Sequence, residues 1–99
     1  SDLADDELRE RFSAFGARGV GCLVAYSGAD EYAPKSVDKP KLVGKICGAC
    51  AAGNAARVAG LVVAGAPHNC AGAEEAFVAA CVAFLTGGAV EGACFDTLK

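Results

Sequence analysis

The sequence lacks methionine and tryptophan entirely, and it has one histidine, His68, among its 99 residues. Because Ser1 opens the chain and no methionine is present, we expect that an upstream segment such as a signal peptide has been removed. Basic residues are in deficit, since nine Lys and Arg face twelve Asp and Glu, which gives a net charge of −3. Binding to nucleic acids usually requires a basic surface, so we expect no nucleic-acid partner.

Long hydrophobic runs are also missing. The longest charge-free stretches, residues 58–73 and 76–90, are shorter than the roughly 20 apolar residues that cross a bilayer. Glycine or proline also interrupts both stretches, and we therefore expect no membrane span. The length of the chain predicts a single domain over residues 1–99.

Cysteine, in contrast, is abundant for a chain of this size. Alanine supplies 22 residues and glycine 13, so few large apolar side chains remain to offset the conformational entropy lost on folding. An even number of cysteines in a small chain is typical of a disulfide framework that forms in an oxidising compartment. We therefore predict a secreted, extracellular protein with three disulfides made by Cys22, Cys47, Cys50, Cys70, Cys81 and Cys94. The pairing we favour is Cys22–Cys94, Cys50–Cys81 and Cys47–Cys70.

Hydrophobic periodicity predicts about three helices. Residues 2–15 carry apolar side chains at helical spacing, and Asp2 is placed to cap that helix. Residues 71–86 form the clearest helix and are apolar nearly all round. The middle segment has two possible assignments: one helix over residues 48–64, or a helix that ends near Arg57 and a strand over 58–64.

Alternating β-branched and aromatic residues predict a strand over residues 20–26, in the middle of a small sheet. Residues 42–46 are a candidate short strand, and residues 89–98 a closing strand. A long polar loop covers residues 27–41. The predicted fold class is α+β, a two-layer sandwich of a small, mainly antiparallel sheet and about three helices, stapled by disulfides.

Two cysteine motifs could carry chemistry. Cys47 and Cys50 form a C-x-x-C at a predicted helix start, where a lowered thiol pKa would suit a thiol-disulfide oxidoreductase with Cys47 attacking and Cys50 resolving. Together with His68 and Cys70 they are also a possible set of zinc ligands. Cys47 and Cys50 have the spacing of the first half of such a site, but the spacing of His68 and Cys70 in the second half is irregular. We expect no metal and no cofactor.

Two other features are candidates for a functional role, the single histidine and the long loop. No serine lies in a Gly-x-Ser-x-Gly motif and the sequence places no nucleophile beside His68, so we expect no catalytic residues and no enzyme activity. Loop 27–41 is the candidate contact region, with the side chains Tyr32, Lys35, Lys39 and Lys41, although a charged loop is more often simply solvated.

Together, the processed N-terminus, the six cysteines, the Ala/Gly-rich composition and the alternating helices and strands resemble small cysteine-rich effectors secreted by filamentous fungi. The resemblance is closest to their killer-toxin-like α/β sandwiches. It implies an effector or toxin that contributes to virulence by binding a surface molecule of a host or competing microbe, without catalysis. Two alternatives are the C-x-x-C oxidoreductase and a structural subunit of an oligomer, whose interface would cover the apolar last helix.

Overall fold

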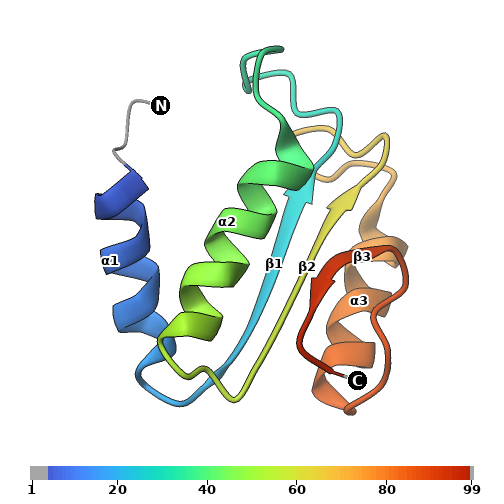
Figure 1. The fold of residues 1–99 in the computed structure, drawn as a ribbon. Helices are drawn as coiled ribbons and strands as arrows, with labels where there is room; N and C mark the ends of the chain where they lie inside the picture. Colours follow the sequence, from blue (N-terminus) through green and yellow to red (C-terminus); the bar gives the residue numbers. More distant parts are fainter. Residues whose placement is uncertain (1–4, 99) are drawn as a thin grey trace.

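The computed structural model describes residues 5–98 and contains three helices and three strands (Figure 1). Their order is α1 (Asp5–Gly16), β1 (Gly21–Ser27), α2 (Lys39–Ala52), β2 (Arg57–Val63), α3 (Glu74–Leu85) and β3 (Ala93–Asp96). The predicted α+β class, with three helices and a small sheet, is confirmed. The predicted cap at Asp2 lies outside the described residues.

The sheet has the strand order β1-β2-β3. β1 pairs parallel with β2, from Gly21 opposite Arg57 to Ser27 opposite Val63, and β3 pairs antiparallel with β2. β1 therefore lies at an edge of the described sheet and not in its middle. The sheet is mixed where we predicted mainly antiparallel pairing, because helix α2 is long enough to return the chain to the end of the sheet at which β1 began.

Helix α2 begins at Lys39, nine residues before the predicted start at residue 48. The Asp38 side chain caps it by accepting a hydrogen bond from the Lys41 backbone N–H at 3.1 Å, and Pro40 occupies the first turn. The predicted strand over residues 42–46 is therefore wrong, since it lies inside this helix. Of the two assignments for the next segment, the shorter helix followed by a strand over 58–64 is correct in kind, although the helix already ends at Ala52 and the strand spans Arg57–Val63.

Helices cover both faces of the sheet, which adds one layer to the two that we predicted. Val58 faces α2 and is buried with Val43 and Cys47, whereas the neighbouring residue Ala59 faces α3 and is buried with Ala80. Helix α1 packs on the outside of α2, as the left side of Figure 1 shows. Because β2 is buried on both faces, its sequence is continuously apolar after Arg57.

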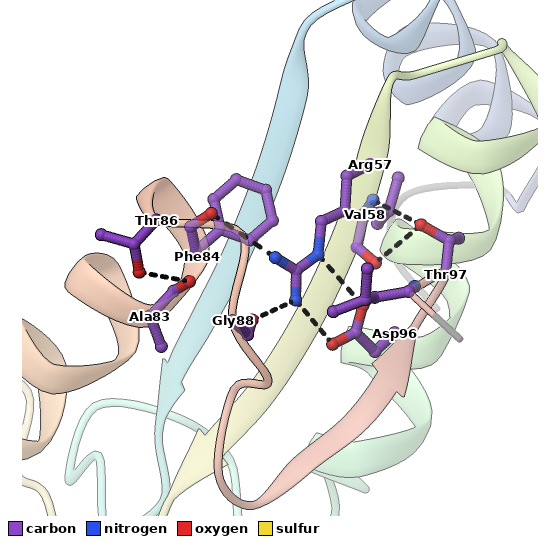
Figure 2. Close-up of polar contacts among 9 residues, drawn as sticks. Arg57, Val58, Ala83, Phe84, Thr86, Gly88, Asp96 and Thr97 are labelled. Carbon is purple, nitrogen blue, oxygen red and sulfur yellow. Dashed lines mark hydrogen bonds and ion pairs between the residues drawn. The ribbon is translucent and has the colours of Figure 1, made fainter.

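Arg57 joins β2, β3 and the end of α3 (Figure 2). Its guanidinium donates to Asp96 Oδ2 at 2.9 Å and to the Gly88 carbonyl at 2.8 Å, and it stacks over the Phe84 ring, 4.9 Å from the centroid. Both partners of this ion pair are largely buried, and the hydrogen bond from Arg57 lowers the pKa of Asp96. Such a pair is costly to break on one side only, because the remaining charge is left buried and unpaired.

Gly60 sets the distance between β2 and α2. A Cβ atom at this position would overlap Cys47 Sγ and lie 2.5 Å from Val43 Cγ1. We expect Gly60→Ala to lower the free energy of unfolding by about 1–3 kcal/mol, because the overpacked α2 must shift. Chemical denaturation monitored by circular dichroism measures the change.

Gly44→Ala is the matched control on the facing helix. No atom lies within 4 Å of a Cβ at Gly44, so this variant should gain roughly 0.5–1 kcal/mol from the higher helix propensity of alanine. Equal stabilities for the two variants would contradict the close approach at Gly60.

Candidate functional site

The loops that follow β1 and β2 lie side by side at one end of the sheet, beyond the two arrowheads in Figure 1. Backbone hydrogen bonds join them: the N–H of Gly28 donates to the Val63 carbonyl and the N–H of Ala29 to the Ala66 carbonyl, both at 2.9 Å. The parallel pairing of the strands causes this arrangement, because both carboxyl ends meet the same edge. Ligand sites of open α/β sheets are found at such an edge.

Asp30 and His68 meet across the two loops. His68 Nδ1 lies 3.0 Å from Asp30 Oδ2 and 3.1 Å from Asp30 Oδ1, and the backbone N–H of Tyr32 donates to Asp30 Oδ1 at 2.9 Å. The Asp30 side chain is only 13% exposed, whereas the His68 side chain is 57% exposed. The carboxylate is thus enclosed by its loop, while the imidazole reaches solvent.

The pair changes the acid–base properties of both groups. The hydrogen bond to Asp30, together with the negative charge of this carboxylate, raises the pKa of His68 above its ordinary value of 6.5. The same hydrogen bond lowers the pKa of Asp30, so that the carboxylate is ionised over the range in which His68 titrates. An ionised Asp30 requires the hydrogen on Nδ1 of the neutral ring, which leaves Nε2 as the proton acceptor.

A histidine base and the carboxylate that orients it are two of the three groups in the catalytic triads of hydrolytic enzymes, and the third group is the nucleophile that the histidine activates. Among residues 5–98, no serine, threonine or cysteine side chain hydrogen-bonds with His68. The described residues therefore hold a histidine and the carboxylate that orients it. The absence of catalytic residues stays a prediction. The sequence did not indicate the contact between His68 and Asp30, because the two are far apart in the chain and no local motif connects them.

The predicted contact loop contributes in part to this site. Tyr32 is 76% exposed, and its ring meets the His68 ring edge-on, with centroids 4.8 Å apart. Lys39 Nζ donates to the Gly28 carbonyl at 2.6 Å and thereby supports the loop. Lys39 and Lys41 belong to α2 and Lys35 to an exposed turn, so these lysines do not form one cluster on the loop. A role in contacting a partner stays a prediction for all four side chains.

None of the predicted disulfides is present: all six cysteines are free thiols, and no two sulfur atoms are at bonding distance. One of the favoured pairs, Cys50–Cys81, also fails in its placement. Cys50 is buried on the α2 face of the sheet with Cys22, whereas Cys81 is exposed on α3, which covers the opposite face. In this structure the buried cysteines act as small apolar side chains that fill the core.

The C-x-x-C lies near the end of α2 and not at its start. The helix dipole there opposes a thiolate, and burial raises the pKa of Cys47 to about 12 and that of Cys50 to about 11. These thiols therefore lack the property on which the oxidoreductase alternative depended. Within residues 5–98 no three His, Cys, Asp or Glu side chains are grouped to hold a metal ion, and no helix is long and apolar enough to cross a bilayer.

Alkylation distinguishes buried thiols from exposed thiols and from disulfides. We expect iodoacetamide to modify Cys81 and Cys94 in the native protein and to leave Cys22, Cys47 and Cys50 unmodified, because these three are buried and the last two have raised pKa values. In denaturant without reductant, all six cysteines should react. Intact mass and peptide mapping give the count, and fewer than six modified cysteines in denaturant would contradict the free-thiol assignment.

Comparison with known proteins places the chain in a family. The model of the family described as protein of unknown function (DUF1749) matches residues 1–86, a range that includes the β1–α2–β2 unit, Asp30, His68 and all of α3. No curated protein and no solved structure matches the chain. Because the family match covers well over half of the sequence, the chain belongs to the DUF1749 family.

Proposed function

We propose that the chain carries the acid–base part of a hydrolase site. His68 Nε2 removes the proton from a hydroxyl, a thiol or a water molecule that attacks an acyl substrate, and Asp30 orients the ring. The observation that carries this proposal is the pair of short contacts between His68 Nδ1 and the Asp30 carboxylate, made by a ring that remains more than half exposed.

The different exposure of the two side chains supports these roles. Asp30 is enclosed and ionised, so it can stabilise the positive charge that His68 acquires when Nε2 takes up a proton. The exposed ring of His68 can reach a substrate, and its raised pKa makes it a stronger base than a free imidazole. In the reverse arrangement, with an exposed acid and a buried histidine, the ring would be less accessible to a substrate.

The position of the pair gives further support by analogy. In α/β-hydrolases the acid precedes the histidine in the chain and the nucleophile precedes both. Here Asp30 follows β1 and His68 follows β2, in that order and at the carboxyl ends of parallel strands. Ser13 and Ser27 precede Asp30 but make no hydrogen bond with His68. In this proposal the nucleophile is therefore a group brought to Nε2 by another segment or molecule.

The effector-like function, the extracellular location and the fungal origin expected from the cysteine content stay predictions. They depended on disulfides, and the six cysteines are free thiols in the structure. The geometry around His68 is a more direct basis for a function, because it involves particular atoms at bonding distance.

Hydrolysis of an activated ester such as p-nitrophenyl acetate tests the acid–base pair. We expect His68→Gln to lower the rate by about 10²–10⁴-fold, because the proton acceptor is lost. The rate of the unmodified protein should rise with pH through the pKa of His68, above 6.5, since only the neutral ring accepts a proton. Asp30→Asn should lower the rate and move this inflection down toward 6.5.

Glu74→Gln is a suitable control, because this exposed side chain lies in the first turn of α3 and makes no hydrogen bond with either residue. Its rate and pH profile should match those of the unmodified protein. A His68→Gln variant that is as active as the unmodified protein would show that the proposal is wrong.

One observation favours a second role, that of an oligomer subunit. Helix α3, which has no basic residue, exposes Val78, Val82 and Leu85 at 60%, 54% and 83% of their residue surface. Their spacing places them along one side of the helix. Apolar stripes of this kind are usually covered by a partner, and a second copy of the chain is the simplest one.

Light scattering coupled to size exclusion tests this second role. We expect a mass of at least two chains for the unmodified protein and of one chain for Val82→Lys, because a buried lysine would oppose apolar contact across the interface. Glu75→Lys serves as the control, because it also adds positive charge to this helix. A single-chain mass for the unmodified protein at high concentration would end the oligomer proposal.

A further inference from the structure

We propose that Glu31 is a positioning residue for His68: its carboxylate holds the backbone of His68 while the neighbouring residue Asp30 holds the ring. The inference rests on the proposed function, because positioning matters only if the imidazole acts on another group. Glu31 touches neither the free ring nitrogen nor any reacting atom, so its role would be exerted through His68 alone.

The geometry is a two-point attachment from adjacent residues. The backbone N–H of His68 donates to Glu31 Oε1 at 2.9 Å, and Nδ1 of the same residue contacts both oxygens of Asp30. With its backbone and one ring nitrogen held by adjacent residues of the same loop, the imidazole loses its freedom to turn away from Asp30. Precise placement of this kind is what catalytic groups require, since small displacements reduce rates strongly.

A third contact limits the remaining motion. The Tyr32 ring packs edge-on against the imidazole at an interplanar angle of 82°, next to the two acidic residues in sequence. Asp30, Glu31 and Tyr32 thus approach the same histidine from one loop. Lys39 of α2 interacts with the Asp30 charge and holds Gly28, so it fixes the loop itself. Asp30 and Glu31 are the charged groups that raise the pKa of His68.

The rest of the His68 loop has few connections to its neighbour. After Ala66, which accepts from Ala29, the backbone hydrogen bonds of this loop other than that of His68 are local, such as the N–H of Cys70 donating to Pro67 and that of Ala71 to the Asn69 side chain. The Cys70 side chain adds one weak contact, with its Sγ 4.0 Å from Ser27 Oγ at the end of β1. Within residues 5–98, the Glu31 contact is the one that attaches the backbone beyond Ala66 to the β1 loop. Removing it would leave His68 attached by its ring alone.

Glu31 could also act merely as a negative charge near the imidazole, and the two roles can be separated. The hydrogen bond from His68 lowers the pKa of Glu31, so the carboxylate is ionised at neutral pH. Glu31→Gln removes the charge but retains an oxygen that can accept from His68. Glu31→Ala removes both the charge and the acceptor. A positioning role predicts a larger effect for alanine than for glutamine.

The test uses NMR titration, because His68 is the only histidine and gives one imidazole signal. We expect the pKa of His68 to fall further in Glu31→Ala than in Glu31→Gln, as the contact with Asp30 loosens. For ester hydrolysis we expect a kcat about 10²-fold lower in Glu31→Ala with little change in KM, and near-complete rescue by Glu31→Gln. Glu74→Ala should leave both measurements unchanged.

Equal pKa values for His68 in the alanine and glutamine variants would overturn the proposal, because Glu31 would then act through charge alone. An unchanged kcat in Glu31→Ala would overturn it as well. If the unmodified protein fails to hydrolyse the ester, the proposed function fails, yet the order of the two pKa values still decides whether Glu31 positions the ring. Glu31 is exposed, so neither variant removes a core contact.

Discussion

The parallel pairing of β1 and β2 is the constraint on which the structure depends. It requires a crossover, which α2 supplies, and it ends both strands at the same edge, with Ser27 opposite Val63. The two following loops are thereby brought into hydrogen-bonding contact. If the two strands were antiparallel, their carboxyl ends would lie at opposite ends of the sheet, and so would Asp30 and His68.

Small side chains make this compact crossover possible. The absence of a side chain at Gly60 lets α2 approach β2 closely, and Cys47 and Val43 fill the space. Cys47 and Cys50, which suggested a redox pair, instead take part in the packing, and their burial raises their pKa values. On the other face, Arg57 connects β2 to β3 through a largely buried ion pair and to the segment after α3 through its hydrogen bond to Gly88.

The candidate site combines a rigid support with an accessible base. The strands fix where the loops begin, the loop after β1 encloses the Asp30 carboxylate, and the imidazole extends toward solvent. The electrostatic effects agree with this arrangement, since each group stabilises the charged form of the other. A general base needs this combination: a fixed orientation, a stabilised protonated form and a free nitrogen. The match to the DUF1749 family includes both residues.

The sequence by itself determined the features that depend on neighbouring residues: the periodicity of α1 and α3, the apolar alternation of β1 and the α+β class. It left β2 ambiguous, because a run of small and β-branched residues fits a buried strand or a helix equally well. Only the tertiary structure decided that β1 and β2 run parallel, that the cysteines pack without pairing and that His68 meets Asp30, 38 residues away in the chain. These outcomes depend on contacts between segments that are distant in the sequence. The free energies of such contacts cannot be read from a local pattern of residues.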